Sequence, residues 1–206
     1  MGDEEIVIGE GPAFERELPK QGSCVARVWR VFNVGLQPGF KGAAAKPNVL
    51  VYFILPYKYS KGDFKGKRML INQKYVAGLG GKSYLRRDAQ AIMGRAIEDE
   101  EVKKGLGIRK AIEGASCLIQ ILHENGYANL KAVMSLPDGV PGLPEDPAAD
   151  PVPDYVPSYV IKLREKAIVQ ERLDTDKIAE KGWEQADRPA PAPLTEQEEK
   201  EALDIF

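Results

Sequence analysis

The amino-acid sequence predicts a mainly β protein in which five strands are combined with one helix, placed between the third and fourth strands. Short runs of β-branched and aromatic residues alternate with segments rich in glycine and proline. One stretch, residues 83–96, instead repeats its apolar residues at helical spacing. The chain has 206 residues, of which 43% are hydrophobic, so it can form one core with additional segments.

Three strands are expected in the first half of the chain, at residues 22–34, 48–55 and 67–76. Residues 35–47 separate the first two and contain three glycines and two prolines, which are loop-forming residues. The polar and basic segment 57–66 separates the second strand from the third. Each strand is therefore bounded by residues that favour turns.

Alternation within the first strand predicts which side chains share a face. Cys24, Ala26 and Val28 are expected on the inner face, with Arg27 and Trp29 on the opposite face. The two cysteines of the chain are expected to be buried free thiols in a reducing compartment.

A helix is expected over residues 83–96, with Ser83 as its N-cap. An irregular or helical connector then leads to two further strands, at 115–123 and 127–136. These strands are separated by Glu-Asn-Gly, and an Asn-Gly pair between two apolar runs is a strong hairpin signal. The last two strands are therefore predicted to pair.

This order of elements is that of the OB fold, a five-stranded barrel that binds oligonucleotides or oligosaccharides. We expect residues 21–137 to form a five-stranded OB-like barrel. An acidic arm (1–20) precedes it, and a Pro-rich acidic linker (138–157) follows. The remainder is predicted to be a partly helical extension (158–188) and an acidic tail (189–206).

Charge is strongly segregated along the chain. The full sequence has a formal net charge of −2. Residues 20–97, however, contain 15 Lys or Arg and two acidic residues, a net charge of +13. The remaining 128 residues therefore sum to −15. Such a distribution is typical of a body that binds a polyanion and has acidic flanking segments.

Aromatic residues follow the basic charge. Ten of the 16 Phe, Tyr and Trp residues lie in the same basic segment. Phe32 and Phe53 are expected in the core, whereas the rings of residues 57–64 lie in a stretch too polar to be core. Interleaved aromatic and basic side chains suit single-stranded nucleic acid, whose unpaired bases can stack on rings.

These patterns predict a DNA-binding site on the outer face of the first three strands and on the two loops between them. The site residues expected from them are Arg27, Trp29, Phe40, Lys41, Tyr52, Tyr57, Lys58, Tyr59, Lys61, Phe64, Lys65, Lys67, Arg68, Lys74, Arg86 and Arg87.

A resemblance to a known family is carried by two segments. Residues 82–88, Lys-Ser-Tyr-Leu-Arg-Arg-Asp, with Met-Gly-Arg at 93–95, resemble a helix of small phage proteins that bind single-stranded DNA. Those proteins have Lys where Arg87 stands. Residues 127–137 resemble the last barrel strand and its exit in the same family. The resemblance covers about residues 22–137 and implies an OB-like protein that protects single strands in phage replication or recombination, in the cytoplasm of a bacterial host.

The C-terminus resembles the acidic tails of bacterial and phage single-stranded-DNA-binding proteins. Residues 194–206 contain five acidic residues and one Lys, and they end in Asp204, Ile205 and Phe206. The resemblance implies that these last three residues bind a replication or repair protein.

No enzymatic activity is expected, and no cofactor or metal. His123 is the only histidine, and neither cysteine has a partner at metal-ligand spacing. The acidic run 98–101 is expected to be a solvated face. No apolar stretch approaches the length of a membrane span, so no membrane contact is expected.

Other functions fit the same patterns. A strand-annealing recombination protein would share the basic body and would assemble into a large ring. An OB-like module that binds a protein or a carbohydrate would not retain an oligonucleotide. The sequence leaves open the oligomeric state, with a homo-oligomer possible, the length of strand bound and the preference between DNA and RNA.

Overall fold

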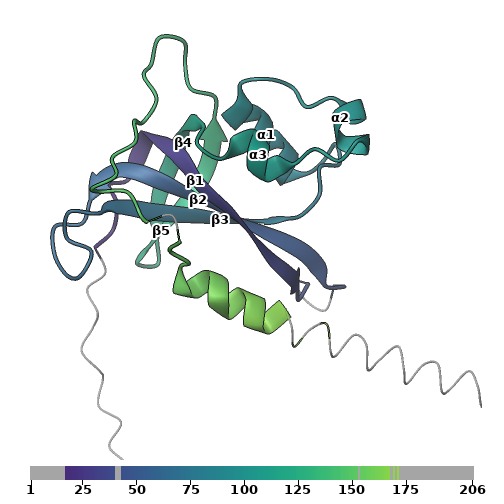
Figure 1. Cartoon of the computed structure of the whole chain (residues 1–206), viewed down its shortest axis with the longest axis horizontal. Coiled ribbons are helices and arrows are strands. Elements are labelled where there is room, and N and C mark those ends of the chain that lie inside the picture. The colour runs from purple at the N-terminus through teal and green to yellow at the C-terminus, as the bar shows by residue number, and fades with distance from the viewer. Residues whose placement is uncertain (1–16, 40–42, 153, 168, 170, 172–206) are drawn as a thin grey trace, which may run out of the picture.

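A computed structural model describes residues 17–39, 43–152, 154–167, 169 and 171. Its centre is one five-stranded antiparallel sheet with the strand order β3-β2-β1-β4-β5 (Figure 1). The strands are β1 (Gly22–Gln37), β2 (Lys46–Lys58), β3 (Arg68–Val76), β4 (Ser116–Glu124) and β5 (Tyr127–Met134). The helices are α1 (Tyr84–Met93), α2 (Asp99–Lys103) and α3 (Ile108–Ile112).

The mainly β fold class is confirmed, with five strands and with α1 between β3 and β4. The connector after α1 contains two short helices, α2 and α3, whose individual positions the sequence pattern did not predict. The expectation of a closed barrel is not met: within the described residues, no β pairing joins the edge strands β3 and β5. The sheet is therefore open between these two strands.

The turn between β4 and β5 explains why this hairpin was predictable. Asn125 has a φ of 52° and Gly126 a φ of 75°. Two consecutive residues with positive φ match the right-handed twist of the flanking strands, and Asn-Gly adopts this conformation at little cost. The hairpin places Tyr127 at the start of β5, directly after the turn.

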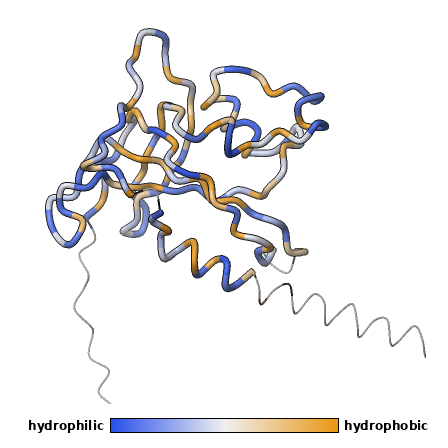
Figure 2. Tube along the Cα trace, in the orientation of Figure 1, coloured by the Kyte–Doolittle hydropathy of each residue, from blue (hydrophilic) through white to orange (hydrophobic). Residues whose placement is uncertain are grey.

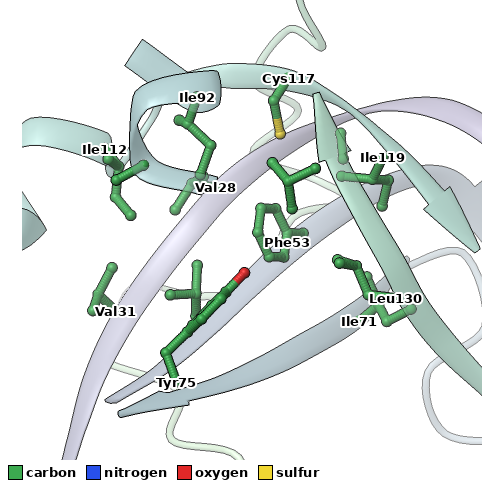
Figure 3. Close-up of a cluster of buried hydrophobic side chains, with 14 of the residues drawn as sticks. Val28, Val31, Phe53, Ile71, Tyr75, Ile92, Ile112, Cys117, Ile119 and Leu130 are labelled. Atoms are coloured by element: carbon green, nitrogen blue, oxygen red, sulfur yellow. The ribbon is translucent and has the colours of Figure 1, made fainter. Parts of the chain in front are cut away.

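The inner face of the sheet packs against α1 and α3. Val28, Phe53 and Ile119 from the sheet and Ile92 from α1 belong to one buried cluster (Figure 3). The side chains expected on the inner face of β1 lie in this cluster. Ser83 caps α1 as expected, because its Oγ accepts a hydrogen bond of 3.4 Å from the amide of Arg86.

The outer face of the sheet is covered by a second layer, formed by a helix over residues 158–167 (Figure 1). Val160 and Leu163 of this helix pack against Phe32, Leu50 and Tyr52. Strand β2 is therefore buried on both faces, which explains its continuous apolar run, visible along the trace in Figure 2. Both Phe32 and Phe53 are core residues, as expected, but they belong to different layers.

The 158–167 helix lies close to β1 and is hydrogen-bonded to it. The side-chain amide of Gln37 donates a hydrogen bond of 2.9 Å to the carbonyl oxygen of Leu163. Gly35 has a φ of +71°, and a Cβ atom there would lie 2.7 Å from the Cβ of Ala167. Glycine is therefore required at position 35 by both its backbone conformation and the approach of the helix.

The two buried cysteines give a direct test of the inner core. Burial raises the pKa of Cys117 to about 12, and burial also raises the pKa of Cys24. Because the thiolate is the reactive form, we expect both thiols to react with a thiol reagent at pH 8 much more slowly in the folded protein than in denaturant. The reaction can be followed spectroscopically. Fast labelling of the folded chain at both positions would contradict this packing.

Candidate nucleic-acid interface

A groove of about 830 Å³ lies at the open side of the sheet. Residues 70–73 of β3 and residues 127–130 of β5 line it from the two edge strands. Residues 17–19 and residues of the 151–162 segment complete its walls. Tyr52 of β2 and residues of the loop between β2 and β3 also line it, so the opening is formed by segments that are distant in the sequence.

Six aromatic side chains line this groove. They are Tyr52, Tyr59, Phe64, Tyr127, Tyr155 and Tyr159. Phe64, Tyr127 and Tyr159 are 52%, 59% and 44% exposed, so large parts of these rings are open to solvent. Tyr59 and Phe64 lie with ring centroids 5.9 Å apart, at an angle of 45°. Exposed rings along a groove are surfaces on which planar groups can stack.

Basic and polar groups lie among these rings. Lys67, Arg68 and Lys162 line the groove together with Asn72 and Gln73. The groove therefore presents positive charge and amide groups next to aromatic surfaces. This combination suits a flat, anionic ligand better than an uncharged one.

One carboxylate lines the groove, that of Glu17. It accepts hydrogen bonds of 2.9 and 3.0 Å from the backbone amide of Ser60. The bond to this amide lowers the pKa of Glu17 below its ordinary value. The carboxylate therefore fastens the N-terminal segment to the loop after β2.

A nearly buried ionic cluster lies on the outer face of β1 and β3. Arg27 and Arg68 both pair with the carboxylate of Asp150, and the Arg68 Nη1–Asp150 Oδ1 distance is 3.1 Å. The side chains of Arg27, Arg68 and Asp150 are 8%, 9% and 11% exposed. Arg27 also pairs at 2.8 Å with Glu145, which is 81% exposed.

Residues 144–150, called the acidic strap below, carry these carboxylates. Lys58 pairs with Asp146 at 3.1 Å, and Lys67 donates to the carbonyl oxygen of Ala148 at 2.8 Å. The backbone amide of Arg68 donates to the carbonyl of Ala149 at 2.8 Å. The segment predicted as a linker, 138–157, forms no helix or strand among its described residues, yet the strap within it is held against the sheet.

The predicted site residues fall into separate groups. The groove itself contains Tyr52, Tyr59, Phe64, Lys67 and Arg68. The loop between β2 and β3 carries Lys61 and Lys65, and β3 carries the exposed Lys74. Five predicted binding residues, Phe40, Lys41, Asp204, Ile205 and Phe206, lie outside the described residues.

Several predicted binding residues are engaged in the fold. Tyr52 is 4% exposed beneath the 158–167 helix, and Trp29 packs against Tyr155 with ring centroids 6.1 Å apart. Tyr57 lies against the inner core, where its hydroxyl and the Cys24 thiol are hydrogen-bond partners. Arg27 faces outward as expected, but it lies under the strap, which the pattern of β1 alone could not predict.

Arg86 and Arg87 lie on α1 and do not line the groove. Arg86 donates to the carbonyls of Leu79 and Ile97 and pairs with Asp99 at 2.7 Å. Arg87 pairs at 2.7 Å with Asp88, whose carboxylate also accepts a 2.9 Å hydrogen bond from the Tyr75 hydroxyl. These contacts fix α1 against β3, so the placement of both arginines in one site with the groove residues is not supported.

Among the aromatic and basic residues of the groove, the sequence pattern missed four: Tyr127, Tyr155, Tyr159 and Lys162. They lie outside the basic segment used to select candidates. The position of Tyr127 after the Asn-Gly turn was a usable signal, because hairpin loops of OB folds contact ligands. No local signal identifies the other three, since they reach the groove only when the chain returns to the sheet.

Among the described residues, no group of three or more His, Cys, Asp and Glu side chains is arranged to hold a metal ion. His123 lies with its Nε2 2.8 Å from the carbonyl oxygen of Pro19, so it fastens the N-terminal segment to β4. Residues 98–101 form a capped start of α2, where Arg95 pairs with Glu101 at 2.9 Å and lowers its pKa to about 2. No helix in the described part of the chain is long and apolar enough to cross a membrane.

No protein-family model matches the chain, and no curated protein matches it significantly. The open five-stranded sheet and its aromatic, basic groove are therefore the observations from which a function can be argued.

Proposed function

We propose that this protein binds single-stranded nucleic acid in the groove between β3 and β5, without reading its sequence. The observation that carries the proposal is the lining of the groove, where the exposed rings of Phe64, Tyr127 and Tyr159 lie beside the basic side chains of Lys67 and Lys162. Rings offer stacking surfaces to unpaired bases of any sequence, and basic side chains pair with the phosphates.

The connectivity supports an OB-like architecture as part of this proposal. Its sheet has β1 between β2 and β4, with the helix α1 between β3 and β4. An OB fold is a partly open barrel that binds oligonucleotides on the face of its second and third strands and on the loops after strands 1 and 4. The groove lies against β2, β3 and the start of β5, which follows the β4–β5 turn.

Charge separates this ligand from the alternatives. An uncharged oligosaccharide also stacks on aromatic rings, but it has no anionic group to pair with Lys67 and Lys162, which line the groove. A double strand would reach the cations with its phosphates, but its bases are already stacked and cannot use the rings. The groove therefore favours a single strand.

The biological setting is also proposed, and the sequence resemblance supports it. We propose that the protein protects single strands during phage replication or recombination in the cytoplasm of a bacterial host. The C-terminal residues Asp204, Ile205 and Phe206 would then bind a replication or repair protein, because a terminal ring with its carboxylate fits an apolar pocket with a basic rim.

Titration with a fluorescent oligo-dT and with a duplex of equal length tests the function. We expect tighter binding of oligo-dT at matched salt, since only the single strand can stack on the groove rings. The slope of log affinity against log salt should be about −0.7 for each phosphate neutralised. Oligo-U in the same assay measures the preference between DNA and RNA.

Equal affinity for duplex and oligo-dT would contradict stacking on the groove rings and would mean that the protein binds nucleic acid only through its positive charge. Binding of neither, by a chain that is folded by circular dichroism, would reject the nucleic-acid function. Ring-shaped protein assemblies on oligo-dT, seen by electron microscopy, would instead favour a strand-annealing protein.

A further inference from the structure

The acidic strap, residues 144–150, lies on cations that belong to the predicted binding surface. Glu145 pairs with Arg27, Asp146 with Lys58, and Asp150 with both Arg27 and Arg68. Lys67 donates to the backbone of the same segment. Four cations, Arg27, Lys58, Lys67 and Arg68, thus contact one short segment that carries three carboxylates. Carboxylates take the same place against guanidinium and ammonium groups as phosphates do.

The contacts of the strap differ in their exposure. Asp150 is 11% exposed and bridges two arginines that are almost fully buried, so it anchors the strap. Glu145 is 81% exposed, and the side chains of Asp146 and Lys58 are 30% and 50% exposed. The Lys58–Asp146 pair is exposed on both sides, and such pairs are weak, so its partners can be exchanged without unfolding the anchor. In the Arg27–Glu145 pair only the carboxylate is exposed, so Glu145 can leave while Arg27 keeps its bond to Asp150.

The guanidinium groups also retain unused donors. The Nε atoms of Arg27 and Arg68 are buried and have no hydrogen-bond partner within the described residues. The Lys58 ammonium lowers the pKa of Asp146 below its ordinary value, so this carboxylate is charged at neutral pH. The carboxylates of the strap thus offset the positive charge of these cations, but they do not accept a hydrogen bond from every N–H group of the two arginines.

We propose that Glu145 and Asp146 compete with the phosphates of the bound strand for Arg27 and Lys58, while Asp150 keeps the strap anchored. This inference rests on the proposed binding of single strands and describes how that binding is moderated. The bound strand would extend from the groove, whose wall includes Lys67 and Arg68, onto the surface that the two carboxylates occupy. The internal competitor would weaken the binding of a single strand and keep it reversible.

The double variant E145Q/D146N tests the competition in the full chain. We expect its affinity for oligo-dT to rise about two- to fivefold for each cation released. Its salt dependence should become steeper by about 0.7 in the log–log slope for each phosphate gained. The matched control is E100Q/D138N, which removes the same charge at exposed acids with no ion pair in the described structure. An equal rise in the control would overturn the proposal, because general charge would then explain it.

A double-mutant cycle with K58Q shows whether Asp146 acts through Lys58. We expect D146N to raise affinity in the natural chain and to have no effect in the K58Q background. The same rise in both backgrounds would exclude a competition at Lys58. If the natural chain binds oligo-dT and E145Q/D146N binds it equally, the competition fails while the binding function stands. If neither chain binds, the proposed function itself fails.

Discussion

A chain that ends at residue 137 is expected to be less stable than one that ends at residue 171 by about 2–4 kcal/mol, despite retaining every strand of the sheet. The shorter chain lacks Val160 and Leu163, whose buried side chains contribute about 1.5–3 kcal/mol each before the cost of ordering the segment. It also exposes Phe32 and Leu50, which these residues cover. Urea unfolding followed by circular dichroism measures the difference, and binding of a hydrophobic dye to the short chain reports the exposed face.

Two point variants within the 158–167 helix provide the control. Leu163 is 5% exposed and Ile161 is 47% exposed, so these two side chains of equal size lie on the same helix and differ in burial. We expect Leu163→Ala to cost about 2–5 kcal/mol and Ile161→Ala to cost less than about 1 kcal/mol. Equal costs, or equal stability of the two truncated chains, would mean that the helix does not cover the sheet in solution.

The double variant Y59A/F64A is expected to bind oligo-dT at least ~30-fold more weakly than the natural chain. Stacking of a base on an aromatic ring contributes about 1–3 kcal/mol, and both rings line the groove. Because Phe64 is 52% exposed, its replacement has little effect on the core. The affinity change should be nearly independent of salt, since no charge is removed.

Tyr84→Ala is the matched control for the ring variants. Tyr84 is 70% exposed, but it lies on α1 and does not line the groove. We expect this variant to bind oligo-dT like the natural chain. A comparable loss of affinity in the control, or unchanged affinity in Y59A/F64A with the fold intact, would remove the loop between β2 and β3 from the site.

The inner half of the fold could be predicted because its signals are local. Alternation in β1 separated Ala26 and Val28 from Arg27, and the Asn-Gly pair determined the β4–β5 turn. The continuous apolar run of β2 was predicted as a strand. Its burial on both faces depends on the 158–167 helix, and no local pattern predicts that this helix packs on β2. Three of the strand pairings, β1–β2, β2–β3 and β4–β5, join neighbours in the chain. The pairing of β1 with β4 and the failure of β3 and β5 to pair depend instead on the geometry of the whole sheet.

The outer half could not be predicted, because it depends on contacts across long stretches of chain. Arg27 meets Asp150 across 123 positions, and Gln37 meets Leu163 across 126. The prolines of residues 138–157 led to the prediction of an extended linker, but a segment without helix or strand can lie on a surface as readily as in solvent, and the strap does so. Charge count identified the basic segment, yet it could not show which cations already have carboxylate partners.

The open side of the sheet has a consequence for aggregation. An edge strand offers a row of unpaired backbone groups to strands of other molecules, and natural proteins protect such edges. Here both edges border the same groove, since residues 70–73 of β3 and 127–130 of β5 line its walls. The N-terminal segment 17–19 and described residues of the 151–162 segment line the same opening. The surface proposed to hold a ligand is thus also where the chain shields its two edges from pairing with another copy.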